Sequence, residues 1–249
     1  MTNVNLDTCA MLVEFNASVW TARKLDRTVS DEVEASKGAR SKGAARVNKN
    51  LLAGRSELED ITAHVNAVRV WVHSNSMPWS DNGQRLLPTT RFVAFDARMA
   101  AHKAVFEQKV NDFVLLYPTL ITAQAMALGE MFHRDEYPAA SSMSSKFAFT
   151  YDYLPVPSSG DFRVDVGTQA QQLLQERMEK LAAARVQKIE TDLQERLVEH
   201  LQRMSKQLVT EQDVKTGELK GKRIYDTLVT GAYDLCDLIK DMRTLKGGG

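Results

Sequence analysis

Six positively charged side chains follow one another between Ala35 and Ser56, with no acidic residue among them. They are Lys37, Arg40, Lys42, Arg46, Lys49 and Arg55. Contact with nucleic-acid phosphates requires long cationic side chains on an adaptable backbone, and Gly38 and Gly43 make this segment adaptable. We therefore predict that the six residues bind DNA, single- or double-stranded, with an affinity that falls steeply as salt rises. The alternative is a solvated basic linker. No aromatic residue interrupts the segment, so base stacking is not predicted.

A second group of candidate binding residues is aromatic and alternates with other residue types. It consists of Phe147, Phe149, Tyr151 and Tyr153. A period of two predicts a β-strand with one aromatic face, and residues 162–166 repeat the pattern as the second strand of a small ribbon. Because a two-stranded ribbon alone is marginal in water, this face either packs on helices or its edge pairs with another chain. We treat the four aromatic residues as candidate partner-binding residues.

Motifs of enzymatic chemistry are missing from the sequence. It contains neither the glycine-rich phosphate-binding motifs nor the short hydrolase and zinc-protease motifs. The five histidines lack the spacing of metal ligands on one helix face. The segment from His133 to Glu136 combines an imidazole with two carboxylates, which we interpret as a solvated helix end, not as an acid/base or metal site. We predict a non-enzymatic protein without metal or cofactor.

Composition describes an ordinary folded chain. Its 249 residues include 32 Lys+Arg and 32 Asp+Glu, so the formal net charge is zero, which argues against a protein that coats nucleic acid with its whole surface. Cys9 and Cys236 are expected to be buried free thiols in a reducing cytoplasm. The longest uncharged run, residues 113–129, contains Pro118 and is too short to span a bilayer, so no membrane contact is predicted.

Hydrophobic periodicity predicts the elements that must position these residues. Helical spacing is expected over Asn5–Ala35, Ser56–Asn75, Arg91–Phe132, Thr168–Val209 and from Lys222 onward. Pro118 must kink or divide the third of these helices. In the fourth, apolar residues recur about every 3.8 residues, which favours a straight or slightly right-handed helix pair. The last two helices are expected to form an antiparallel hairpin, within one chain or between chains.

The connection between the second and third helices contains two prolines and Trp79. We interpret Trp79 as the residue that anchors this loop on the core. Arg85 and Arg91 are expected either to extend the basic surface or to pair with Asp81 and Asp96.

The order of these features resembles a group of bacteriophage proteins of unknown function, whose genes lie near those of MoxR-type AAA+ ATPases. The resemblance is carried by the basic loop, the Trp79 loop, Tyr137-Pro138, and the strand Asp161–Val164 after Pro155-Val156-Pro157. It spans residues 20–204 and excludes the helix after Lys215. It implies a phage or prophage origin, a role in a larger assembly and the host cytoplasm as location, and it transfers no catalytic residue.

The sequence thus predicts an elongated, mainly α protein with a small two-stranded β-ribbon and a long C-terminal antiparallel helical hairpin. The expected division is a head over residues 1–166 and the hairpin over 167–249. The expected function is a phage-type assembly protein that forms homo-oligomers and contacts nucleic acid through its basic loop. The alternative is an adaptor or inhibitor that binds a protein partner, an AAA+ ATPase or a host enzyme, through the hairpin.

Overall fold

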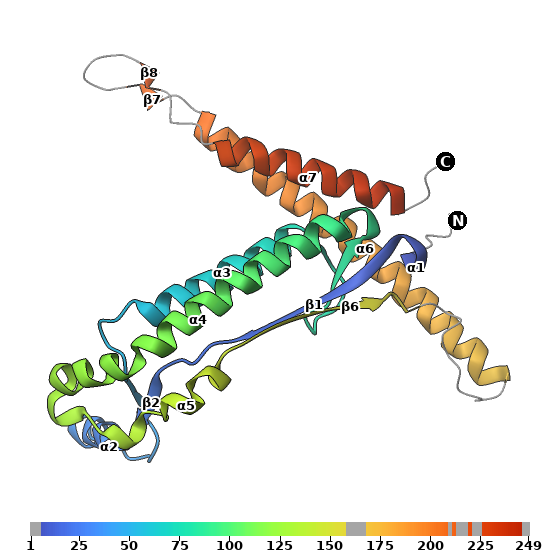
Figure 1. The fold of residues 1–249 in the computed structure, drawn as a ribbon. Coiled ribbons are helices and arrows are strands. Elements are labelled where there is room, and N and C mark those ends of the chain that lie inside the picture. The colour runs from blue at the N-terminus through green and yellow to red at the C-terminus, as the bar shows by residue number, and fades with distance from the viewer. Residues whose placement is uncertain (1–5, 158–167, 209–210, 213–218, 221–225, 246–249) are drawn as a thin grey trace. The chain divides into compact units, whose positions relative to one another are not determined.

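The protein is mainly helical, as the sequence predicts. A computed structural model describes residues 6–157, 168–208, 211–212, 219–220 and 226–245, and 67% of these residues are helical (Figure 1). The α-helices are α1 (Leu6–Cys9), α2 (Arg27–Ser36), α3 (Glu57–Ser74), α4 (Phe92–Leu128), α5 (Ala140–Met143), α6 (Thr168–Leu208) and α7 (Asp226–Leu245). Short 3-10 helices are η1 (Thr89–Arg91), η2 (Gly129–Met131), η3 (Arg134–Glu136) and η4 (Ser144–Lys146).

The strands form three antiparallel groupings. They are β1 (Ala10–Ser18), β2 (Arg23–Asp26), β3 (Val47–Asn50), β4 (Met77–Pro78), β5 (Arg85–Pro88), β6 (Ala148–Pro155), β7 (Glu211–Gln212) and β8 (Leu219–Lys220). The largest sheet has the order β4-β5-β1-β6, while β2 pairs with β3 and β7 pairs with β8. In the largest sheet, Ala10 lies opposite Pro88 and Val13 opposite Arg85.

The chain divides into two compact units, each built from separate stretches of sequence. Unit 1 contains residues 1–15, 69–99 and 151–249, and unit 2 contains residues 16–68 and 100–150. The long elements β1, α3, α4 and β6 each contribute residues to both units. The hairpin expected as a separate segment after residue 166 therefore belongs to the same unit as β4 and β5.

Unit 1 has a core that joins the C-terminal hairpin to the sheet. Ile189 and Leu193 of α6 and Leu238 of α7 cluster with Leu12 of β1 and Leu86 of β5. Figure 1 shows α6 and α7 side by side, with the chain running in opposite directions. Within unit 1, α6 and α7 thus pack against each other and share one core.

Unit 2 has an aromatic core centred on α4. Phe106, Phe113 and Tyr117 are buried on one face of this helix, and Phe113 contacts Phe147 with ring centroids 5.6 Å apart. α3 packs beside α4 here, because the rings of His64 and His102 lie 5.6 Å apart. The helix continues through Pro118 without division, so that part of the expectation, a divided helix, is wrong.

Two expectations about strands need correction. The segment Asn5–Ala35 is not one helix, because β1 and β2 interrupt it and only the short helices α1 and α2 are helical. The reason is non-local: β1 is stabilised by hydrogen bonds to β5, more than seventy residues away, which override its loosely helical spacing. β6 belongs to a four-stranded sheet and not to a two-stranded ribbon, and its expected partner at 162–166 lies outside the described residues.

Candidate nucleic-acid interface

The predicted basic loop is the middle of a small structure that we call the basic module, residues 23–55 of unit 2. It runs from β2 through α2 and a loop at residues 37–46 to β3, and β2 pairs with β3. In this pairing Arg23 lies opposite Asn50, and Lys24 lies opposite Lys49. α2 and the loop together therefore connect the two strands of an antiparallel pair.

Local hydrogen bonds fix the start of α2. Asp26 is the N-cap residue, in extended conformation, and its Oδ1 accepts a hydrogen bond from the Val29 backbone N–H at 3.1 Å. This bond satisfies one of the N–H groups that a helix start leaves unpaired. The buried Ser30 hydroxyl donates to the Asp26 carbonyl and accepts from the Val47 N–H at 3.0 Å. A single side chain thus ties the helix start to the first residue of β3.

The two ends of the loop are also tied to each other. Glu34 Oε1 accepts a hydrogen bond from the Ala45 N–H at 3.0 Å, near the end of the loop. Within the loop, Gly38 and Gly43 have φ angles of +64° and +79°, values that glycine adopts more easily than any other residue. The end of the loop is thus tied to α2 by a hydrogen bond, and the loop cations lie on a backbone whose ends are fixed.

Lys49 departs from the prediction, because it is not available to a phosphate. It is 4% exposed, its Nζ lies 2.6 Å from Glu136 Oε2 and 3.8 Å from Asp26 Oδ2, and it donates to the Met131 carbonyl at 2.7 Å. A buried ammonium needs this pairing, since its charge has lost the solvation of water. Lys49 therefore fastens β3 to the segment after α4, and its assignment to nucleic-acid binding is wrong.

The remaining predicted cations are exposed. Lys37, Arg40, Lys42 and Arg46 are exposed, and Arg55 is half-buried. The structure adds three exposed cations that the sequence analysis missed: Arg23, Lys24 and Arg27. Helical spacing over Asn5–Ala35 predicts one helix there and separates these residues from the basic loop, whereas the pairing of β2 with β3 places them in the basic module. An excess of basic over acidic residues from Arg23 to Arg55 is the signal that could have found them.

Acidic residues do not cancel the module's charge. Residues 23–55 hold nine Lys or Arg against four carboxylates, a formal charge of +5 in a chain whose total is zero. Two of the four carboxylates are already engaged, Asp26 with Lys49 and Glu34 with the Ala45 backbone. The four loop cations Lys37, Arg40, Lys42 and Arg46 therefore present concentrated positive charge.

The module offers no aromatic platform for bases. The nearest aromatic side chain in the sequence, Trp20, is half-buried and packs on Phe113 and Tyr117, with ring centroids 6.4 Å and 5.7 Å away. Base stacking needs an exposed ring face. Without such a ring, the exposed cations of the module suit contact with phosphates better than readout of bases.

The aromatic face of β6 packs on α4, which is the first of the two arrangements predicted for it. Phe147 and Phe149 are buried, and Phe149 contacts Phe106 of α4 with ring centroids 5.3 Å apart. They are unavailable to a partner, so their assignment as partner-binding residues is wrong. Tyr151 and Tyr153 are half-buried, and Tyr153 donates to Asp96 at 3.1 Å, so that face too is occupied within the chain.

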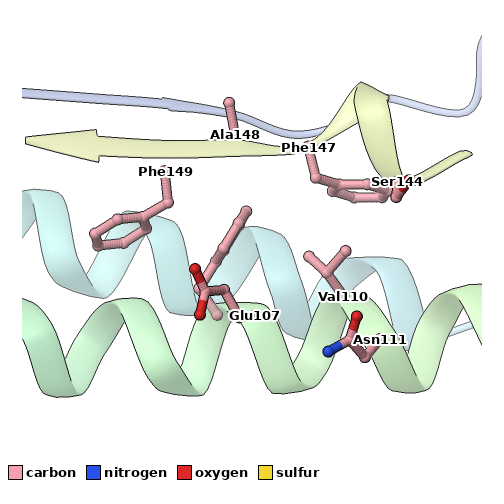
Figure 2. A pocket seen from close by; sticks show the side chains of 8 residues that line it. Glu107, Val110, Asn111, Ser144, Phe147, Ala148 and Phe149 are labelled. Atoms are coloured by element: carbon pink, nitrogen blue, oxygen red, sulfur yellow. The ribbon is translucent and has the colours of Figure 1, made fainter.

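A shallow cavity of 330 Å³ lies where β6 and η4 approach α4 (Figure 2). Phe106, Val110, Phe147 and Phe149 form its apolar wall, and Glu107 and Asn111 stand at its polar side. Glu107 is exposed and lies 4.0 Å from Lys103, one turn earlier on α4. In the described part of the chain no group of three or more His, Cys, Asp or Glu side chains is arranged to hold a metal ion.

Two cations of unit 1, Arg85 and Arg196, are held by hydrogen bonds at the end of α3. Arg85 donates to the Ser76 hydroxyl at 2.7 Å and to the Ser76 and His73 carbonyls at 2.8 and 3.2 Å. Arg196 donates to the same two carbonyls and pairs with Asp192 at 2.9 Å. Burial, together with the charge of Arg196, lowers the pKa of Arg85 to about 10. Two guanidinium groups thus cap the C-terminal end of α3.

Around the Trp79 loop, the ion pairs differ from those expected. Trp79 is buried in the core of unit 1, as predicted, with the Arg185 guanidinium 4.3 Å from its ring centroid. Arg85 contacts neither expected carboxylate, Arg91 pairs with Asp241, and Asp81 pairs with Lys188 at 2.7 Å. The hydrogen bond from Lys188 lowers the pKa of Asp81. The partners come from α6 and α7, which are distant in the sequence.

Both cysteines are free thiols, as expected, but they are exposed and not buried. Cys9 ends the short helix α1, and Cys236 lies on a face of α7 that the core does not use.

Comparison of the chain with protein-family models, curated proteins and solved structures gives no match.

Proposed function

We propose that this protein is a non-enzymatic, phage-type assembly protein that self-associates and contacts the phosphate backbone of nucleic acid through its basic module. The observation that carries the proposal is the contrast in pairing within the module: Lys49 is buried and paired, while Lys37, Arg40, Lys42 and Arg46 are exposed on a loop with fixed ends. Exposed cations attract phosphates and release counterions on binding.

Fixed loop ends support this function, because they lower the entropy lost when the loop binds. The absence of an aromatic platform in the module makes the expected binding independent of sequence. Arg23, Lys24 and Arg27 extend the same positive surface along β2 and the start of α2. We propose that the protein acts in the host cytoplasm, the location that the resemblance to phage proteins implies.

The test is binding to labelled single- and double-stranded DNA of about one to two helical turns, at 50 and 200 mM salt. The loop variant changes Lys37, Arg40, Lys42 and Arg46 to Ser and leaves Lys49 in place, because removing Lys49 would disturb the fold. We expect the variant to lose at least tenfold in affinity and to show a weaker salt dependence, by about one unit of slope for each lost phosphate contact.

A matched control removes the same charge elsewhere. Arg177, Lys180, Arg203 and Lys206 are exposed on α6, so changing these four to Ser gives the same net charge outside the module. We expect this control to keep most of the affinity. Equal losses in both variants would show that only net charge matters, and absence of binding to the wild type at 50 mM salt would overturn the nucleic-acid function.

One observation favours the adaptor function as a second candidate. The hairpin carries exposed apolar side chains at Val198 and Leu201 of α6 and at Val229 and Tyr233 of α7, and Tyr233 is 69% exposed. Exposed apolar side chains of this size on two adjacent helices are typical of a protein-binding surface. If DNA binding is absent, changing Leu201 and Tyr233 to Ser would test this surface by loss of co-purification with a candidate ATPase.

A further inference from the structure

The β2–β3 pair of the basic module has two different faces. In an antiparallel pair, residues directly opposite each other point to the same side, and successive residues alternate between the sides. Arg23 lies opposite Asn50 and Leu25 lies opposite Asn48, which puts these four side chains on one side of the pair. We call this side the ribbon face. Lys49 belongs to the other side.

Ion pairs agree with this assignment of the two faces. The Lys49 ammonium lies 3.8 Å from Asp26 Oδ2 and 2.6 Å from Glu136 Oε2. Asp26 lies opposite Val47, two residues before Lys49, so the register places Asp26 and Lys49 on the same side of the pair. That side is attached to the segment after α4, where Glu136 lies in η3. The ribbon face is therefore the side turned away from this attachment.

The ribbon face carries groups that can recognise base edges. Arg23, Asn48 and Asn50 are exposed, and Leu25 between them is half-buried. Asn50 Oδ1 accepts a hydrogen bond from the Leu52 backbone N–H at 3.1 Å, which orients this amide and leaves its Nδ2 group as a donor. Guanidinium groups bind guanine O6 and N7, and side-chain amides bind the edge of adenine, both in the major groove.

The dimensions of the strand pair match the major groove of B-form DNA. Paired strands lie about 4.8 Å apart, so a two-stranded ribbon enters the major groove, about 12 Å wide, but not the minor groove, about 6 Å wide. Asn48 and Asn50 are two residues apart, about 7 Å along the strand, which corresponds to about two base-pair steps. Arg23 lies opposite Asn50 and reaches the same step.

Cations beside the ribbon face are placed to hold the phosphates that border a groove. Arg27 directly follows β2, Arg46 directly precedes β3, and both are exposed. Because Asp26 lies opposite Val47, these two cations lie at the same end of the strand pair. Contacts with phosphates position a protein on the duplex, and contacts with base edges then supply specificity.

Double-stranded DNA suits these groups better than the other forms of nucleic acid. Single strands are held by stacking of their bases on exposed rings, and residues 23–55 contain no aromatic residue. The major groove of double-stranded RNA is too deep and narrow for side chains to reach the bases. Polar donors on a two-stranded ribbon, flanked by cations, instead match the major groove of B-form DNA in both charge and size.

We infer that the ribbon face enters the major groove of double-stranded DNA, where Arg23, Asn48 and Asn50 contact base edges while the neighbouring cations contact phosphates. The inference rests on the nucleic-acid binding of the proposed function, and it names the form of nucleic acid and the face that recognises it. The loop contacts phosphates without regard to sequence, so a preference for particular base pairs comes from the ribbon face.

The first test is selection of bound sequences from a random pool of double-stranded DNA. Wild type should enrich a motif of about two to three base pairs and bind it about tenfold more tightly than unselected DNA. Arg23→Lys/Asn48→Ala keeps the net charge but removes the guanidinium and one amide, so it should lose the preference and keep the salt dependence. Arg177→Lys/Asn111→Ala, at exposed positions of α6 and α4, is the matched control and should keep the preference.

The second test is methylation interference, which uses wild-type protein and depends on no variant. Guanine N7 lies in the major groove and adenine N3 in the minor groove, so methylation of each atom marks one groove. Methylation of guanine N7 within the selected motif should weaken binding about tenfold, and methylation of adenine N3 should have little effect. Interference by adenine N3 alone would contradict entry into the major groove.

The remaining outcomes separate this inference from the proposed function. If wild type binds DNA and the loop variant does not, but no sequence is enriched, the ribbon face reads no bases and the proposed function stands alone. A preference that survives in Arg23→Lys/Asn48→Ala would also overturn the inference, as would equal affinity for the selected duplex and for single-stranded DNA or double-stranded RNA of the same sequence. If wild type binds no DNA at 50 mM salt, both the inference and the nucleic-acid function are overturned.

Discussion

Basic side chains near the end of α3 in unit 1 have a different environment from those of the basic module in unit 2. In unit 1, Arg85, Arg196 and Arg91 are each held by backbone carbonyls or carboxylates. In the basic module of unit 2, Lys37 and Arg40 are exposed on a loop, and only Lys49 is buried and paired. The same residue types therefore stabilise one region and remain available to a ligand in the other. The two regions differ in whether the fold places carbonyl or carboxylate oxygens beside the cations, and amino-acid composition cannot show this.

The largest expected effect comes from breaking the one cation of the basic module that is internal. Lys49→Met should destabilise unit 2 by about 3 kcal/mol, because it leaves the carboxylate of Glu136 poorly solvated and without its partner. Lys42→Met, at an exposed position of the same module, should change stability by less than about 0.5 kcal/mol. Urea unfolding followed by circular dichroism measures both.

A double variant checks the cause. Lys49→Met/Glu136→Gln should recover part of the loss, because both members of the pair are then uncharged. If Lys49→Met is as stable as Lys42→Met, the distinction between internal and available cations within the module fails.

In unit 1, removing a capping guanidinium should cost less. Arg85→Ala removes the hydrogen bonds to the Ser76 hydroxyl and to the Ser76 and His73 carbonyls. We expect a loss of about 2 kcal/mol in unfolding free energy, because Arg196 still donates to both carbonyls. DNA affinity should be unchanged. A loss of DNA binding in this variant at temperatures where it is folded would contradict the division between the two regions.

Sequence reasoning succeeded where the signal is local and failed where partners are distant. The periodicity of α3, α4 and α6 predicted these helices within a few residues, and the alternation in β6 predicted a strand with an aromatic face. The pairing of β1 with β5 and the pairing of Lys49 with Glu136 could not be predicted, because both join residues more than seventy positions apart. A run of basic residues indicates charge, but the fold decides which member is buried.

Tyr117 of unit 2 tests the effect of burial on a side chain that is neutral in the folded chain. Burial raises the pKa of Tyr117 from 10 to about 12, and its hydroxyl donates to the Pro138 carbonyl. Between pH 10 and 12 the folded chain keeps a proton that the unfolded chain loses, so stability is present below pH 10 and is lost as pH rises through this window. We expect wild type to lose about 1 kcal/mol more than Tyr117→Phe over this range, in urea unfolding at each pH. Equal losses would contradict the assignment.

The smallest expected effect is the titration of His73, which lies beside the two capping guanidinium groups of unit 1. Burial lowers its pKa below the ordinary 6.5, Arg85 and Arg196 lower it further, and Asp192 opposes them. A lowered pKa means that the contribution of neutral His73 to stability is present above pH 6.5 and is lost as pH falls through the folded-state pKa. We expect a loss of a few tenths of a kcal/mol between pH 7 and pH 5 that is absent in His73→Gln. The imidazole NMR titration should place the pKa of His73 below 6.5 in wild type and higher in Arg85→Ala, which retains the guanidinium of Arg196. A pKa of 6.5 or above in wild type would show that burial and the charges of Arg85 and Arg196 do not destabilise protonated His73, and this prediction would be wrong.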